Sequence, residues 1–223
     1  MHQIDAHLGE VLQALTDKGF DNNTLVIFTG DNVPESIAYP RIQNYDHYSM
    51  GSLRGVKQDV WEGGHRVPFI IRWPRVVEAN TVNRELISQI DIMGTLASIV
   101  GYELPHNAAD DSHDILPLLR GESNQSTRET LVHRTWRKPW GIRHREWVYI
   151  NAATGSVQKE PEWRGYPPNP YEDWLNNIRE DRGQHKNLVS EYPERAKLLR
   201  SKLKAIRESS STAPRLESNT DNQ

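Results

Sequence analysis

Apolar residues recur at the spacing of an α-helix in three parts of the chain. The first stripe predicts a helix that Gly19 can close in a left-handed cap, and it consists of Ile4, Leu8, Val11, Leu12 and Leu15. The second stripe, ended by Gly101, consists of Ile90, Met93, Leu96, Ala97 and Val100. The third begins near Pro193 and consists of Ala196, Leu199, Leu203 and Ile206.

Two apolar runs without polar alternation predict buried strands. Thr24–Thr29 reads TLVIFT, and Val67–Trp73 reads VPFIIRW. A continuous run of this kind is typical of a parallel strand that is covered on both faces. A helix, a short turn and a buried strand in succession form the repeating unit of an α/β sheet, so the first part of the chain is predicted to be α/β.

From about Pro105 onward the pattern changes to short pieces. Ile115–Leu119 is one apolar helical turn. Three strand-like pieces predict a small antiparallel sheet: Thr130–Arg134, Gly141–His144 and Trp147–Asn151. Residues 155–185 are rich in Pro, Gly, Asn and Trp, which predicts long loops. The polar, repeat-free segment 209–223 is expected to be disordered.

Composition and charge exclude several classes of protein. The formal net charge of −3, with both signs mixed along 223 residues, gives no electrostatic case for nucleic acid or an anionic membrane as a partner. The chain has no cysteine, which excludes disulfides and thiolate metal sites. It has no apolar run long enough for a transmembrane helix, and its first residues, MHQIDAHLGE, do not form a signal peptide.

Asp31 and Asn32 follow the first apolar run directly. In open α/β sheets, ligands bind beyond the carboxyl ends of the strands. A carboxylate and an amide oxygen are hard ligands that suit Ca²⁺ or Mg²⁺, although Ca²⁺ takes six or more oxygens and two donors cannot hold it alone. The alternative is an ordinary turn, where Asp and Asn are common.

Lys57 lies in a glycine-rich segment, Gly51–Pro74, which reads GSLRGVKQDVWEGGHRVPFIIRWP. Glycines let the backbone approach an anion closely, and a lysine ammonium is a compact charge that suits a tetrahedral oxyanion. The alternative is a solvated loop lysine. Arg54 is expected to support this loop through hydrogen bonds, and His65 either reaches the same site or packs in its turn.

These segments together resemble the sulfatase family of arylsulfatases and carbohydrate sulfatases. The resemblance rests on TLVIFTGDN at residues 24–32 and on LRGVK followed by WEGG, and it extends to Gln89–Gly101, Asp111–Gly121 and Arg179–Leu188. It implies an α/β, alkaline-phosphatase-like sulfatase fold. Residues 1–105 would form the C-terminal portion of the large mixed-sheet catalytic domain. Residues 106–208 would form its end and a small subdomain with an antiparallel sheet and a helix.

The resemblance also implies roles for the candidate residues. In sulfatases the lysine of this motif contacts the substrate sulfate, so Lys57 would be catalytic and substrate-binding, with His65 a second substrate-binding residue. Asp31 and Asn32 would complete a site for Ca²⁺ (or Mg²⁺). The reaction would be hydrolysis of an aryl or carbohydrate sulfate ester, and the partner a sulfated small molecule or glycan. An intact parent is compatible with export to the periplasm or the extracellular space.

The family's nucleophile is missing from this sequence. Sulfatases oxidise a Cys or Ser in a C/S-x-P-x-R signature to formylglycine, and the nearest match here, Glu191–Arg195, starts with a glutamate. We therefore expect a C-terminal fragment that is inactive alone, with the formylglycine in a missing N-terminal part. The alternatives are a non-catalytic remnant or binding module, and a metal-dependent phosphatase or phosphodiesterase of the same superfamily, which would need further His or Asp ligands.

Overall fold

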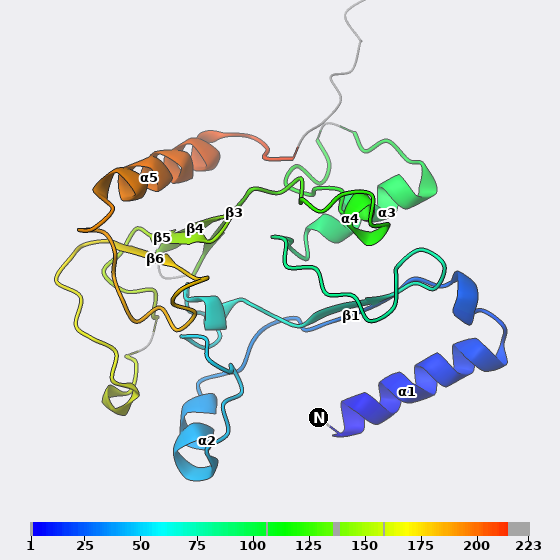
Figure 1. The fold of residues 1–223 in the computed structure, drawn as a ribbon, viewed down its shortest axis with the longest axis horizontal. Helices are drawn as coiled ribbons and strands as arrows, with labels where there is room; N and C mark the ends of the chain where they lie inside the picture. Colours follow the sequence, from blue (N-terminus) through cyan, green and yellow to red (C-terminus); the bar gives the residue numbers. More distant parts are fainter. Residues whose placement is uncertain (1, 106, 136–138, 158, 214–223) are drawn as a thin grey trace, which may run out of the picture.

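The computed structural model describes residues 2–105, 107–135, 139–157 and 159–213, and it shows an α/β arrangement with two antiparallel sheets (Figure 1). The helices are α1 (His2–Asp17), α2 (Ala38–Tyr45), α3 (Asp91–Val100), α4 (Leu116–Leu119) and α5 (Pro193–Glu208). Short 3-10 turns lie at Asp21–Asn23, Glu62–Gly64 and Glu162–Arg164. None of the helices in the described part of the chain has both the length and the apolar character needed to cross a membrane.

The first sheet pairs β1 (Val26–Thr29) with β2 (Phe69–Arg72). The pairing is antiparallel, with Val26 opposite Arg72 and Thr29 opposite Phe69, so the predicted parallel direction is wrong for this pair. An apolar run favours a strand that is covered on both faces, but it does not encode the direction of the neighbouring strand. The predicted coverage of both faces is also wrong within this chain, because the residues of both strands are only partly buried and Ile70 is exposed.

Helices α3 and α4 cover one face of this sheet. A small, mainly apolar recess between the helices and the sheet is lined by Leu25, Ile27, Phe69, Ile71, Ile92, Thr95, Leu96, Ile115 and Leu119. Helix α3 ends at Gly101 in the left-handed region (φ 68°), as the sequence predicts, because glycine adopts this conformation without a Cβ clash. By contrast, α1 buries none of its residues.

The second sheet contains β3 (Thr130–Arg134), β4 (Trp140–His144), β5 (Trp147–Ile150) and β6 (Trp174–Asn177), in this order and antiparallel throughout. The three predicted strands of a small antiparallel sheet are confirmed. The fourth lies inside segment 155–185, where the prediction of loops alone is wrong. Its two asparagines are poor strand formers, but Asn176 is buried and its side chain bonds both Gln184 and the Asp181 carbonyl.

The main apolar core lies between this sheet and α5, which packs across it in Figure 1. The core consists of Ile142, Trp147, Tyr149, Leu175, Leu188, Ala196, Leu199 and Leu203. Three of the four apolar residues that predict the last helix are buried here, so the amphipathic pattern identified the face that meets the sheet.

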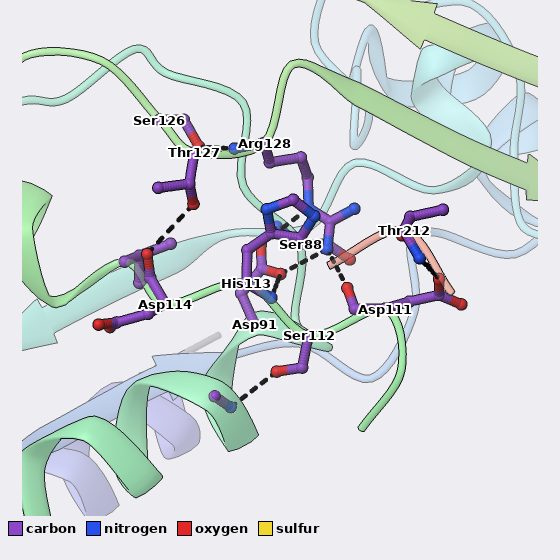
Figure 2. A network of polar contacts seen from close by, with 12 residues as sticks. Ser88, Asp91, Asp111, Ser112, His113, Asp114, Ser126, Thr127, Arg128 and Thr212 are labelled. Carbon is purple, nitrogen blue, oxygen red and sulfur yellow. Dashed lines mark hydrogen bonds and ion pairs between the residues drawn. The ribbon is translucent and has the colours of Figure 1, made fainter. Parts of the chain in front are cut away.

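A buried ion pair joins α3 to the segments that follow it (Figure 2). Arg128 Nε donates to Asp91 Oδ2 at 3.0 Å, and Asp91 Oδ1 also accepts the backbone N–H of His113 at 2.9 Å. Thr212 donates to Asp111 Oδ1 at 2.6 Å, so the chain is tied down just before residue 214. The prediction of disorder falls mainly on residues 214–223, which lie outside the described residues, and the predicted domain limits stay predictions.

The packing of α5 on the sheet can be tested with two adjacent leucines. Leu199 has no exposed surface (0%), so Leu199→Ala should lower the free energy of unfolding by about 2–5 kcal/mol. Leu198, its neighbour, is 48% exposed, and Leu198→Ala should change it by less than about 0.5 kcal/mol. Urea unfolding followed by tryptophan fluorescence gives both values. Equal effects would show that α5 does not pack on the sheet through this face.

Candidate functional site

The two predicted metal ligands lie at an exposed loop directly after β1. The Asn32 side chain donates from Nδ2 to Asp31 Oδ2 at 2.5 Å, and its backbone N–H donates to Asp31 Oδ1 at 2.9 Å. Gln89 holds the strand end, because its Nε2 donates to the Gly30 carbonyl at 2.7 Å and to Thr29 Oγ1 at 3.0 Å. The carboxylate and the amide are therefore presented together at the carboxyl end of the strand.

Lys57 is joined to the same loop through its backbone and its side chain. Its N–H donates to the Pro34 carbonyl at 2.8 Å, and its Nζ donates to Glu35 Oε1 at 2.7 Å. The hydrogen bond and charge of Glu35, with a further contribution from the Asp31 carboxylate, raise the pKa of Lys57. The structure therefore brings Lys57, a cation at neutral pH, next to Asp31 and Asn32.

Glu35 was not identified from the sequence. It follows Asn32 by three residues in segment 33–37, which precedes α2 and carries no motif of its own. The feature of the sequence that could have indicated it is a second acidic residue close to Asp31, in the segment that follows β1. In the structure Glu35 is the direct counter-ion of Lys57, so it belongs to the candidate site.

The glycines of the Lys57 loop serve close packing. A Cβ on Gly63 would lie 2.5 Å from the Arg54 carbonyl oxygen, and a Cβ on Gly64 would lie 2.2 Å from the Asp59 carbonyl oxygen. Gly55 adopts a φ of 91°, which side chains rarely tolerate. These positions fold the segment tightly on itself, and this compact turn carries Lys57 on its surface.

His65 lies in a compact polar cluster behind this turn. Its ring stacks on the ring of His133, with centroids 3.9 Å apart, and its Nε2 lies 3.7 Å from Glu62 Oε1. Burial opposes ionisation of Glu62, but the adjacent His65, followed by the charges of two arginines, outweighs burial and lowers the pKa of Glu62 to about 2. His65 thus has structural contacts, and its role toward a substrate stays a prediction.

His133 is held as a neutral ring. Its Nε2 lies 3.0 Å from the Val60 carbonyl, which can only accept, so this nitrogen carries the proton. Its Nδ1 is buried, and no described residue forms a hydrogen bond with it. Burial and the neighbouring His65 lower the pKa of His133 to about 3.

The donor set at the end of β1 fits part of a hard-cation site. Asp31 and Asn32 offer oxygen ligands in an exposed position, and Glu35 adds negative charge nearby. No cluster of three or more His, Asp or Glu side chains that could hold a metal is present among the described residues. These two residues would therefore supply only a fraction of the ligands that Ca²⁺ takes.

Comparison with known families gives two matches. A family described as Sulfatase matches residues 1–102, and one described as N-sulphoglucosamine sulphohydrolase, C-terminal, matches residues 56–152. Together the two matches reach from the first helix to the end of the third strand of the small sheet.

Individual relatives give the same result over more of the chain. It is 31% identical over 212 residues to N-acetylgalactosamine-6-O-sulfatase of Bacteroides thetaiotaomicron, which covers 92% of this chain and 40% of the relative. It is 38% identical over 165 residues to human steryl-sulfatase, which covers 73% of this chain and 25% of the relative. The chain therefore spans less than half the length of these curated relatives.

Solved structures agree on the fold. A structure from work on glycosaminoglycan metabolism by Bacteroides thetaiotaomicron superimposes with a TM-score of 0.77 at 31% identity, covering 93% of this chain and 43% of that one. A sulfatase from Pseudoalteromonas sp. gives a TM-score of 0.72 at 23% identity, covering 94% and 42%. The expected fold class is confirmed.

The buried neutral state of His133 predicts a dependence of stability on pH. Its pKa of about 3 lies below the ordinary value of 6.5, so between these pH values the unfolded chain binds a proton that the folded chain does not. His133→Gln keeps an N–H donor but does not titrate. As the pH falls from 6 to 4, the original chain should lose about 1.4 kcal/mol of stability per pH unit relative to this variant.

Urea unfolding of both proteins at several pH values measures this difference. Asp59, whose pKa burial raises to about 6, has the opposite sign, because its folded form gains a proton first and is stabilised as the pH falls. It is present in both proteins, so its contribution cancels in the comparison. If the free energies of unfolding of the two proteins differed by the same amount at every pH, the assignment of a neutral, buried His133 would be contradicted.

Proposed function

Because the chain belongs to the sulfatase family, we propose that it forms part of an enzyme that hydrolyses sulfate esters. The observation that carries the proposal is the hydrogen bond from the Lys57 N–H to the Pro34 carbonyl at 2.8 Å. This bond fixes the lysine loop against the loop that follows Asp31 and Asn32. Lys57 and the proposed cation ligands Asp31 and Asn32 are therefore carried by two adjoining loops at one strand end.

Lys57 is proposed to bind the sulfate group. An ammonium has three donor hydrogens, and Glu35 uses one of them, so the others remain for sulfate oxygens. During attack on sulfur, negative charge moves onto the sulfate and leaving oxygens, and a fixed cation there stabilises the transition state. The raised pKa of Lys57 keeps it charged for this role.

Asp31 and Asn32 are proposed to hold Ca²⁺ or Mg²⁺ with further ligands from outside the described set. A divalent cation bound there would polarise the sulfate group. Formylglycine, the nucleophile of the family, would supply covalent catalysis. The sequence contains no Cys or Ser in the required signature, so we propose that this group comes from a part of the protein beyond these 223 residues.

The proposed substrate is a carbohydrate sulfate. The relative that matches 92% of the chain is an N-acetylgalactosamine-6-O-sulfatase, and one solved structure with the same fold holds D-glucosamine-2-N,6-O-disulfate. Steryl and aryl sulfatases match a smaller part of the chain, so sulfated small molecules are the second class to test.

The ligand count predicts weak calcium binding by the chain alone. Asp31 and Asn32 provide two side-chain donors, whereas Ca²⁺ takes six to eight oxygens. Calorimetric titration of the 223-residue chain with CaCl₂ should show no saturation below about millimolar concentrations. Binding at micromolar concentrations would mean that this chain contains further ligands. The proposal that most of the ligands come from another part of the protein would then be wrong.

The proposed sulfate-binding residue Lys57 and the proposed metal ligand Asp31 should respond differently to mutation. In a protein that carries this chain together with the formylglycine region, Lys57→Ala should reduce sulfate release from an aryl sulfate by about 100-fold or more, roughly 3 kcal/mol. Added Ca²⁺ should not rescue it. Asp31→Ala should reduce both metal affinity and activity, with partial rescue by Ca²⁺.

Lys186→Ala is the matched control, because Lys186 Nζ forms an exposed ion pair with Glu191 of the same 2.7 Å length that Lys57 has with Glu35. This variant should keep the original rate, since surface ion pairs contribute little. If Lys57→Ala kept nearly the rate of the unmutated protein, the assignment of this loop as the sulfate-binding site would be wrong.

A further inference from the structure

Arg54, three residues before Lys57, is buried and fully engaged. Its Nε donates to Glu160 Oε1 at 2.9 Å, and its Nη1 donates to the Gln184 carbonyl at 2.9 Å. Its guanidinium lies over the rings of Trp61 at 3.9 Å and Tyr166 at 4.1 Å. Glu160, Tyr166 and Gln184 all come from the part of the chain that follows β5.

Asp59, two residues after Lys57, makes a second link to the same region. Its Oδ2 accepts the Val56 N–H at 2.9 Å, within the lysine loop, and its Oδ1 accepts the Val157 N–H at 2.8 Å. The adjacent Val60 N–H donates to the Gly155 carbonyl at 2.7 Å. The lysine loop is therefore held on both sides of Lys57, by Glu160 before it and by Gly155 and Val157 after it.

We propose that Arg54, Glu160 and Asp59 are positioning residues, which fix the lysine loop on residues 155–157 and on Glu160 and thereby set the location of the Lys57 ammonium. Lys57 itself has one backbone contact to the strand-end loop, at Pro34, and a long flexible side chain. The two links flank it at short distance along the chain. The effect of these residues on catalysis rests on the proposed function, whereas their effect on the conformation of the lysine loop does not.

Backbone hydrogen exchange on the 223-residue chain tests the positioning directly. Glu160→Gln keeps the shape of the side chain but removes the charge that pairs with Arg54. The Lys57 and Val56 amides should then exchange about tenfold faster or more, because their loop opens without global unfolding. The Tyr149 amide, in the core strand β5, serves as the internal reference and should keep its rate.

Two further variants make the result decisive. Glu160→Gln leaves a buried guanidinium without a counter-ion, which can destabilise the whole chain. Arg54→Met with Glu160→Gln removes both charges, so the core should stay protected while the Lys57 amide still exchanges faster. Glu129→Gln breaks an exposed pair with Arg145 (2.9 Å) and should change neither amide. Unchanged exchange at Lys57 in the double variant would overturn the proposal.

Activity separates this inference from the proposed function. In the protein with the formylglycine region, Glu160→Gln should lower kcat/KM about tenfold or more, since small misplacements of a catalytic group have large effects. Combined with Lys57→Ala, it should lower activity no further than Lys57→Ala alone. An additive loss would show that Glu160 acts elsewhere and would refute positioning through Lys57. If Lys57→Ala has no effect, the proposed function fails, and the exchange result still decides the positioning.

Discussion

The packing of Val60 and Trp61 against the four-stranded sheet is the contact on which the candidate site depends. Both side chains have no exposed surface, and they lie in a cluster with Val148, Ile150, Trp174 and Ile178. Trp61 meets Trp174 edge to face, with ring centroids 5.0 Å apart. Burying these two apolar side chains contributes several kcal/mol, which stabilises the packing of the lysine loop against the four-stranded sheet.

This anchor lets a segment without regular secondary structure hold a defined shape. The close approach of Gly155 to the Trp61 ring leaves no room for a Cβ, which would lie 2.8 Å from it. Polar links then form around the apolar contact, where water is excluded and hydrogen bonds are worth more. The strand-end loop with Asp31 and Asn32 is joined to this assembly through Pro34 and Glu35. The site is thus assembled from three parts of the chain that are distant in sequence.

The sequence predicted those features that periodicity and local motifs encode. Helices α1, α3 and α5 and three strands of the small sheet follow from apolar spacing. The contact between Lys57 and the loop after β1 is consistent with the two motifs, at residues 24–32 and 53–57. Strand β6 was missed because Asn176, a poor strand former, is stabilised by Gln184, a contact that only the folded chain creates. Helix α2 was missed because it is short and contains Pro40, although Ala38, Tyr39 and Ile42 are buried. Glu160, the partner of Arg54, is separated from it by 106 residues, so no local pattern could indicate it.

The ion pair between Lys57 and Glu35 has a consequence for the order in which ligands bind. Asp31, Glu35 and Lys57 together carry two negative charges and one positive charge, so the strand end has a net negative field. A sulfate ester is itself an anion, and like charges repel each other. A divalent cation at Asp31 and Asn32 would reverse the sign of this field. On the proposed assignment, the cation would bind first and the substrate second.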